Sequence, residues 1–298
     1  MDYRPILHML SPLRHVSPFD VNMAVDAGFA AVVPYTGVEL GEIAGLIQDA
    51  IFSRGPKGAR ATGAFIGGKS AELALDMLDA ARKAMVPPFE ISVFADPAGS
   101  FTTAAAMVAK VGRRLREDQG SGWRDRRVAV FGGTGVVGFA AAMIAAGEGA
   151  KATLVGYDGE ARVKRLAEMA GKRFGVRLQP ADGSSAADKA RLLADAEIVL
   201  CAGRAGVPVL DGGLLAAARQ LRIAADVNAV PPAGIAGLGA QDDGKALAGT
   251  AAVGIGALAI GGVKYKVQAG LFRRMIEAPK PFYIDFRDAF ALAREIVG

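Results

Sequence analysis

The sequence predicts an α/β protein of two domains, and three observations support this. Apolar runs of strand length alternate with helical patterns over the first 116 residues and again after residue 128. A polar stretch at 117–127 contains Gly120-Ser121-Gly122 and is the best linker candidate between the two series. The length agrees, because 298 residues are long for one domain and comfortable for two.

In the first series, short apolar runs predict strands, and longer amphipathic patterns predict helices. Gly28 ends the first helical pattern, and Pro87-Pro88 closes the third. Strands are expected at 6–10, 31–34, 64–66 and 91–95, and helices at 20–28, 38–52, 70–85 and 102–116.

The most informative segment follows the linker, at 128–158. A strand at 128–131 runs into G-x-G-x-x-G at Gly133, Gly135 and Gly138, then into a helix at 139–148 and a second strand at 152–155. Such glycines permit a tight turn, close approach of a pyrophosphate and helix–strand packing, and the helix N-terminus favours the anion. Asp158 lies where a carboxylate accepts hydrogen bonds from the adenosine ribose. The segment therefore predicts a Rossmann-type domain that binds a nicotinamide dinucleotide.

The rest of the chain continues the α/β pattern. Helices are expected at 160–174 and 186–193, and strands at 176–178, 198–201 and 223–227. The last helices, at 263–277 and 285–297, carry no nucleotide motif and are expected to return to the first domain. We predict a Rossmann domain at 121–264 and a smaller α/β substrate domain at 1–120, completed by 265–298, with a cleft between the two domains.

Loops beyond the carboxyl ends of the strands give the candidate cofactor contacts. The predicted set is Gly133, Thr134, Gly135, Val136, Val137, Gly138, Tyr157, Asp158, Ala202, Gly203 and Asn228.

Composition excludes several classes of protein. With 52% hydrophobic and 22% charged residues, disorder is not expected. The net charge of +5 is spread among acidic residues with no basic block, so nucleic acid is not a predicted partner. The single cysteine, Cys201, fits a reducing compartment, and the two histidines, His8 and His15, lack metal-ligand spacing, so no metal site is predicted.

A membrane span is not predicted either. The uncharged stretches 128–147 and 246–263 are broken by glycines, and the N-terminus lacks a signal-peptide pattern. We expect a soluble, cytoplasmic protein that self-associates into a homo-oligomer.

Several long motifs carry a family resemblance. They are Gly67-Gly68-Lys69, the segment 95–104 (ADPAGSFTTA), the turn 131–138, the segment 226–235 (DVNAVPPAGI) and the segment 254–264 (GIGALAIGGVK), with shorter ones at 17–20 and 51–54. The chain resembles the NAD(P)-dependent methylene-tetrahydromethanopterin dehydrogenases of methylotrophic bacteria over nearly its whole length, in particular the branch that accepts both NAD and NADP.

The resemblance implies oxidation of 5,10-methylene-tetrahydromethanopterin to the 5,10-methenyl cation, within formaldehyde oxidation. Hydride transfer of this kind needs alignment of two ring systems rather than acid–base groups. The expected catalytic residues are Lys264, Asp20 and Asp96, and the expected substrate contacts are Phe19, Lys69, Ser100, Thr102, Thr103 and Ile260. Each has a structural alternative, such as helix capping by Asp20 and Asp96 or a surface position for Lys264.

Cofactor choice depends on Tyr157 and Asp158, where NADP-restricted members of the family have a basic residue. The carboxylate of Asp158 should repel a 2′-phosphate, although Arg162 and Lys164 lie close enough in sequence to compensate. We predict that NAD is favoured and NADP tolerated.

Three rival functions share this layout: a methylene-tetrahydrofolate dehydrogenase, a shikimate-type dehydrogenase and a nucleotide-sensing regulator without hydride transfer. An added cyclohydrolase activity stays open.

Overall fold

The computed structural model describes residues 3–298, and by its contacts the chain divides into two compact units. Unit 1 comprises residues 3–102 and Tyr265–Leu292, and unit 2 comprises Thr103–Lys264 and Ala293–Gly298. The division falls near the start of a long helix, α5 (Ser100–Gln119), whereas the expected domain ranges change at 120/121. The first residues of the expected linker are therefore helical, and the ion pairs of Arg113 and Arg114 with Glu117 stabilise this last part of α5.

Unit 1 contains a five-stranded parallel sheet in the order β12-β4-β3-β1-β2. Its strands are β1 (Ile6–Ser11), β2 (Ala31–Thr36), β3 (Thr62–Ile66), β4 (Ser92–Ala95) and β12 (Tyr283–Ile284). The helices of this unit are α1 (Pro18–Asp26), α2 (Ile43–Phe52), α3 (Gly55–Ala59), α4 (Ala71–Lys83) and most of α11 (Phe286–Val297), with short 3-10 turns η1 (Leu40–Glu42) and η2 (Pro97–Gly99).

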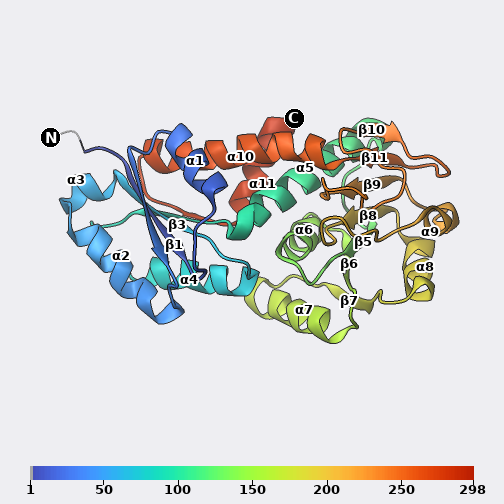
Figure 1. Ribbon diagram of the computed structural model, residues 1–298, viewed down its shortest axis with the longest axis horizontal. Coiled ribbons are helices and arrows are strands. Elements are labelled where there is room, and N and C mark those ends of the chain that lie inside the picture. The colour runs from blue at the N-terminus through green and yellow to red at the C-terminus, as the bar shows by residue number, and fades with distance from the viewer. Residues whose placement is uncertain (1–2) are drawn as a thin grey trace. The chain divides into compact units, whose positions relative to one another are not determined.

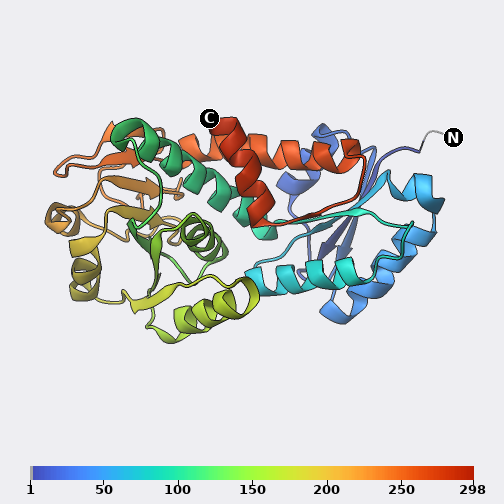
Figure 2. The ribbon, with the colours of Figure 1, turned by 180° about the vertical axis from the view of Figure 1, so that it is seen from behind.

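Helices cover both faces of this sheet, as parallel sheets require. In Figures 1 and 2, α2 and α4 lie on one face, and α1 with the later part of α10 (Ala257–Glu277) lies on the other. Phe272 of α10 packs between Phe65 of β3 and Phe94 of β4, with ring centroids 5.4 and 5.3 Å away. These aromatic contacts explain how a segment distant in sequence returns to the first unit.

Unit 2 contains a seven-stranded sheet in the order β10-β11-β9-β8-β5-β6-β7, parallel except for β10. Its strands are β5 (Arg127–Phe131), β6 (Lys151–Gly156), β7 (Gln179–Asp182), β8 (Ile198–Cys201), β9 (Ile223–Asp226), β10 (Asp243–Ala246) and β11 (Val253–Ile255). Its further helices are α6 (Val136–Gly147), α7 (Ala161–Phe174), α8 (Ala186–Asp195) and α9 (Gly212–Ala217). In Figures 1 and 2, α6 lies on one face of the central strands and α8 and α9 on the other.

The predicted α/β fold is confirmed, most element boundaries differ by a few residues, and two differences have a clear physical reason. The strand expected at 176–178 begins instead at Gln179, and this edge strand accommodates Pro180 because an edge position needs no ladder donor there. The helix expected from 263 begins at Ala257, because buried Ile260, Val267 and Leu271 give it a continuous apolar face that outweighs Gly261 and Gly262. No pattern in the sequence predicted α3, α9, β10, β11 or β12.

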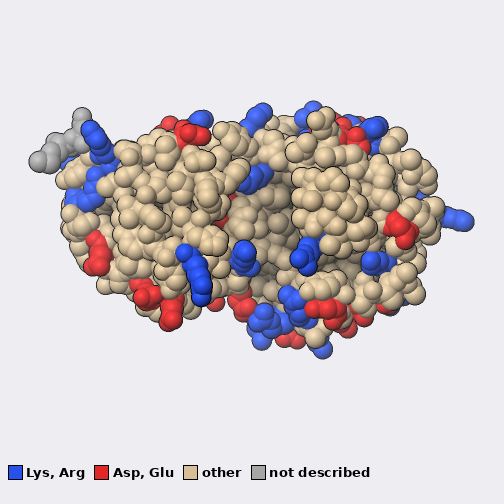
Figure 3. Space-filling model, in the orientation of Figure 1, with Lys and Arg blue, Asp and Glu red and all other residues tan. Residues whose placement is uncertain are grey.

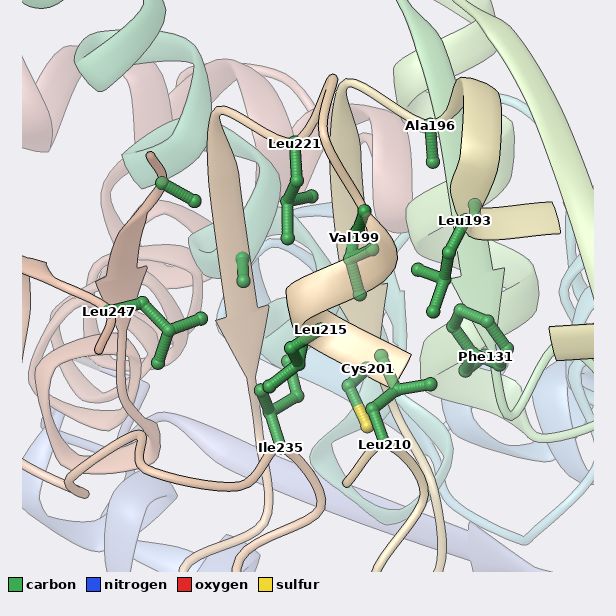
Figure 4. Packing of buried hydrophobic residues seen from close by; sticks show 14 of the residues in the cluster. Phe131, Leu193, Ala196, Val199, Cys201, Leu210, Leu215, Leu221, Ile235 and Leu247 are labelled. Carbon is green, nitrogen blue, oxygen red and sulfur yellow. The ribbon is translucent and has the colours of Figure 1, made fainter. Parts of the chain in front are cut away.

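Packing under the C-terminal ends of β5, β8 and β9 fixes the loops that follow them. Phe131, Val199 and Cys201 of the strands contact Leu193 of α8 and Leu215 of α9, all nearly inaccessible to solvent (Figure 4). Burial of side chains of this size stabilises by about 1.5–3 kcal/mol each. The strand ends therefore form a rigid base for a site.

Surface charge is mixed in sign. On the face drawn in Figure 3, Lys and Arg side chains are interspersed with Asp and Glu. Within residues 3–298, none of the helices is both long and apolar enough to span a membrane.

Candidate functional site

The turn after β5 has the shape of a phosphate-binding loop. Gly132 adopts φ +77°, and its position against the carbonyl of Ala202 leaves no room for a side chain. The Gly133 amide donates to the carbonyl of Val155 at 3.1 Å, and the Gly135 amide donates to that of Gly132 at 3.0 Å. These bonds hold the turn between β5 and β6.

Two glycines of the motif are required by packing, and a third is not. A Cβ on Gly138 would overlap the Gly132 carbonyl oxygen, and one on Gly133 would lie 2.6 Å from Leu154 Cδ2. A Cβ on Gly135 would meet only the Gly132 carbonyl oxygen, at 3.3 Å. Gly135 is also the N-cap of α6 and makes no side-chain cap, so the first amides of the helix are not capped by it. The open side of Gly135 therefore fits the close approach of a pyrophosphate.

A cavity of about 540 Å³ opens beside this turn. It is formed by the loops that follow β5, β6, β7 and β8, together with the start of α8, and most of its walls are apolar. The lining residues are Phe131, Gly132, Thr134, Gly135, Val155, Gly156, Tyr157, Gly183, Lys189, Ala202, Gly203, Arg204, Val207, Pro208 and Val209. The volume and the four strand ends match what the adenosine half of a dinucleotide requires.

An ion pair stands at the end of β6. Arg162 Nη1 donates to Asp158 Oδ2 at 3.0 Å and to the Tyr157 hydroxyl at 3.2 Å, and its guanidinium lies 5.9 Å from the centre of the Tyr157 ring. The hydrogen bonds to Asp158 and then to Tyr157 raise the pKa of Arg162, so the group stays cationic. Asp158 thus carries a counter-ion one helical turn away.

The outer wall of the cavity is a loop at 204–209, which we call the wall loop. Asn228 Oδ1 accepts from the amides of Gly206 at 3.2 Å and Val230 at 3.0 Å, and its Nδ2 donates to the Pro232 carbonyl at 3.0 Å. The Val209 amide donates to the Gly234 carbonyl at 2.8 Å. With its amide engaged in this way, Asn228 positions the wall loop and is not among the residues that line the cavity.

Buried Asp226 anchors the loop that carries Asn228. Its carboxylate accepts from the amides of Asn228 at 2.9 Å and Ile235 at 3.1 Å. Burial raises the pKa of Asp226, opposed by these backbone hydrogen bonds. Burial, and then the nearby Asp226 charge, also raises the pKa of the Cys201 thiol far above its usual value, so Cys201 is an inert core residue.

In unit 1, two predicted carboxylates are buried and hydrogen-bonded. Asp20, on α1, accepts from Gln268 Nε2 of α10 at 2.7 Å. Asp96 accepts from the Phe101 amide at 2.8 Å and from the Thr102 hydroxyl at 2.6 Å. Asp96 therefore caps the start of α5, which is the structural alternative that its sequence context left open.

The remaining unit 1 candidates differ in exposure. Phe19 and Lys69 are exposed, whereas Ser100 and Thr102 are buried. The turn that leads to Ser100 holds Ala98 at φ 55°, a left-handed conformation that a residue other than glycine adopts at a cost of about 1–3 kcal/mol. Such strain is frequent at functional sites, and it lies within the motif 95–104.

The last candidates lie in unit 2. Thr103 is half-buried on α5. Lys264 is half-buried in the interior of α10, one turn after buried Ile260, and does not begin that helix.

Comparison with known proteins decides the family. The family model for the N-terminal part of methylene-tetrahydromethanopterin dehydrogenase matches residues 18–98. The NAD(P)-dependent methylenetetrahydromethanopterin dehydrogenase of Methylorubrum extorquens is 54% identical over 295 residues, which cover 99% of both chains. The chain belongs to this dehydrogenase family. The predicted family resemblance is thereby confirmed.

The chain is also similar to a second relative and to a solved structure. The bifunctional protein MdtA of the same organism is 32% identical over 94% of both chains. Shikimate 5-dehydrogenase from Listeria monocytogenes, solved with shikimate and NAD, has a TM-score of 0.52 at 13% identity, over 99% of this chain and 96% of that one. At that identity the likeness supports the fold alone.

Five of the cofactor contacts that the sequence predicted line the cavity. Thr134, Gly135, Tyr157, Ala202 and Gly203 line it. Gly133 and Gly138 shape the turn, while Val136 and Val137 begin α6.

Lys189 and the wall loop line the cavity but were not predicted from the sequence. The wall loop has neither periodicity nor a motif, and the only available signal was the turn chemistry of Gly206 and Pro208. In the sequence, Lys189 resembles any other lysine of an amphipathic helix, and only the fold places it in the cavity.

Proposed function

We propose that this protein catalyses reversible hydride transfer from 5,10-methylene-tetrahydromethanopterin to NAD(P)+, giving the 5,10-methenyl product and NAD(P)H. The observation that carries the proposal is 54% identity over 99% of the chain to a dehydrogenase named for this substrate and cofactor. The glycine turn and the adjoining cavity support it, because they fit a dinucleotide.

In this proposal the residues of unit 2 bind and orient the cofactor. The amides at the start of α6 bind the pyrophosphate, the cavity holds the adenosine, and Asp158 accepts hydrogen bonds from the ribose hydroxyls. The nicotinamide ring supplies hydride acceptance when it is bound. The protein contributes alignment of the two rings and exclusion of water.

The residues of unit 1 and α10 would hold the carrier. We propose catalytic roles for Lys264, Asp20 and Asp96. A buried carboxylate such as Asp20 stabilises the positive charge that develops on the one-carbon unit. Lys264 orients the pterin by donating a hydrogen bond to one of its oxygens. Phe19, Lys69, Ser100, Thr102, Thr103 and Ile260 are the proposed substrate contacts.

Turnover assays test the reaction directly. NAD(P)H absorbance would be followed with methylene-tetrahydromethanopterin and, in parallel, with methylene-tetrahydrofolate. We expect NAD(P)+ to be reduced with the methanopterin substrate and not with the folate substrate. Reduction only with the folate substrate would replace the proposed carrier, and no reduction with either, despite binding of NADH, would refute the proposed reaction.

We further propose that NAD is favoured and NADP is tolerated. Asp158 opposes a 2′-phosphate, which adds negative charge, but its ion pair with Arg162 offsets that charge and supplies a donor for the phosphate. We expect Asp158→Ala to shift the preference toward NADP. We expect Arg162→Gln to lower kcat/KM for NADP by about tenfold, equivalent to about 1.4 kcal/mol, and to leave NAD within about twofold.

Lys164→Gln on the same helix is the matched control for Arg162, since Lys164 is exposed and, within residues 3–298, forms no ion pair with Asp158. An unchanged NAD/NADP ratio in Asp158→Ala would show that the ion pair at the end of β6 does not set cofactor preference.

A further inference from the structure

Lys189 and Arg204 bring positive charge into a cavity whose walls are otherwise mostly apolar. Lys189 lies one turn into α8, and its ammonium Nζ donates to the Val209 carbonyl at 2.8 Å. An ammonium has three N–H donors, and this is the one bond recorded for its side chain within residues 3–298. Two donors therefore remain for water or a ligand.

The charge of Lys189 is not neutralised locally. Among the residues that the structure describes, no carboxylate lies within ion-pair distance of its ammonium. The neighbouring Asp188 is instead bonded to Arg191 at 2.9 Å and to the hydroxyl of Ser185.

The surroundings of Lys189 favour a flat heteroaromatic ring over a phosphate. Val207, Pro208 and Val209 of the wall loop are apolar, Val155 contributes a further apolar surface, and Arg204 at the start of the loop is exposed. A Cβ at Gly183, after β7, would overlap Val155 of β6. Because glycine has no side chain, the ends of these two strands can lie close together at the cavity. A phosphate among such side chains would lose its hydration, whereas an adenine ring buries its faces and needs only a few edge contacts.

We propose that Lys189 recognises the adenine of the cofactor, donating one hydrogen bond to a ring nitrogen while another holds the wall loop through Val209. Adenine presents its ring nitrogens as acceptors along its edges, so an ammonium is a suitable partner. This inference rests on the proposed function, because it takes the cavity as the adenosine pocket. It makes Lys189 a determinant of base specificity common to NAD and NADP.

The anionic groups of the cofactor, the pyrophosphate and the 2′-phosphate of NADP, bind elsewhere in this proposal. The pyrophosphate belongs to Gly135 and the start of α6. The 2′-phosphate of NADP belongs beside Asp158 and Arg162, after β6, while Lys189 follows β7 on α8. A contact of Lys189 with the 2′-phosphate would favour NADP alone, and an adenine contact would act on both cofactors equally.

Binding measurements without turnover test this assignment. AMP and its 1-deaza, 3-deaza and 7-deaza analogues, each lacking one ring nitrogen, would displace NADH from the full-length protein, followed by NADH fluorescence. In the wild type we expect one analogue to bind about tenfold more weakly than AMP, the size of one charge-assisted hydrogen bond. In Lys189→Met we expect the affinity for AMP to fall about tenfold, whereas the affinity for that deaza analogue should be the same as in the wild type.

Lys151→Met is the matched control, because Lys151 is an exposed lysine at the opposite, amino-terminal end of β6. It should behave as wild type. Equal affinity of AMP and all three analogues for the wild type would overturn the inference without any variant. The inference would also be overturned if the deaza analogues lost the same affinity relative to AMP in the wild type and in Lys189→Met. It would be overturned as well if Lys189→Met lowered affinity only for ligands that carry a 2′-phosphate, such as 2′,5′-ADP.

The outcomes separate this inference from the proposed function. If AMP displaces NADH equally from wild type and Lys189→Met, only the role of Lys189 fails. If AMP does not displace NADH from the wild type, the cavity is not the adenosine pocket, and the proposed cofactor placement fails with it.

Discussion

Gly138, the last glycine of the G-x-G-x-x-G motif, offers a sharp test of the site, because the atoms that surround it belong to the backbone and cannot move aside. In Gly138→Ala the new Cβ would overlap the Gly132 carbonyl oxygen and lie 2.8 Å from its carbonyl carbon and 3.1 Å from Gly133 Cα. Those atoms are held by the bonds of Gly133 to Val155 and of Gly135 to Gly132, at 3.1 and 3.0 Å. The turn must therefore shift or α6 must separate from β5.

The magnitude follows from these contacts. Overpacking of a well-packed site costs about 1–3 kcal/mol, and overlap with fixed backbone places Gly138→Ala in the upper part of this range. The better helix propensity of alanine returns up to about 1 kcal/mol. A net loss of about 2 kcal/mol corresponds to a Tm lower by roughly 4–8 °C for a unit of this size. Displacement of the turn should also weaken NADH binding by more than about tenfold.

Two matched glycines separate packing from ligand approach. A Cβ on Gly135 would meet only the Gly132 carbonyl oxygen, at 3.3 Å, so Gly135→Ala should fold with nearly wild-type Tm yet bind NADH weakly. A Cβ on Gly147, in the last turn of α6, would have nothing within 4 Å. Gly147→Ala should therefore raise stability by up to about 1 kcal/mol and leave binding unchanged.

The assays are thermal unfolding by circular dichroism and NADH fluorescence titration of the same preparations. Wild-type Tm and wild-type affinity in Gly138→Ala would refute the packing argument. Unchanged NADH affinity in Gly135→Ala would refute the placement of the pyrophosphate at α6.

Two further predictions concern the supports of unit 2. Asn228→Ala removes the bonds to Gly206, Val230 and Pro232, so NADH affinity should fall by about tenfold while Asn228→Asp, which keeps the acceptor, loses less; equal titration curves for Asn228→Ala and wild type would contradict this. At the amino-terminal ends of β5 and β8, burial acts to raise the pKa of Glu197, but bonds from the Arg127 amide and from Arg126 outweigh it and leave the pKa below its usual 4.5. The ionised Glu197 therefore stabilises the fold above pH 4.5, and this stabilisation is lost as the pH falls through the lowered pKa. In urea unfolding, we expect Glu197→Gln to be less stable than the wild type by about 1–2 kcal/mol at pH 7, and this difference in unfolding free energy should become smaller in acid. A difference that grows in acid would contradict the lowered pKa.

The parts of the site that sequence could predict are those with local causes. The strand, glycine turn and helix at 128–148 form a unit whose glycine spacing is visible in the sequence, and Gly138 is required by Gly132 only six residues away. Asp158 follows β6 at the expected place, and alternating apolar runs gave the central strands because parallel strands are buried on both faces.

Other features depend on contacts between distant segments. The wall loop is held by Asn228, Gly234 and Lys189, which no local pattern connects to it. Asp96 shows a related difficulty, since an acid before a helix gives the same signal whether it caps the helix or binds a ligand, and the structure shows the capping bonds. In α10, the Gly261-Gly262 pair suggested a break that packing of the helix overrides.

The buried carboxylate of Asp226 fixes the segment that makes these contacts between distant residues. Its burial is unfavourable for a charge, and the amides of Asn228 and Ile235 offset this by donating to both of its oxygens. Those same bonds fix both ends of the loop after β9, which presents Asn228 to Gly206 and the Gly234 carbonyl to Val209. The wall loop is therefore shaped by the protein itself, and a cofactor that enters the cavity need not order it. Since ordering a loop on binding lowers affinity, a carboxylate that does not line the cavity contributes to cofactor binding through the rigidity of its wall.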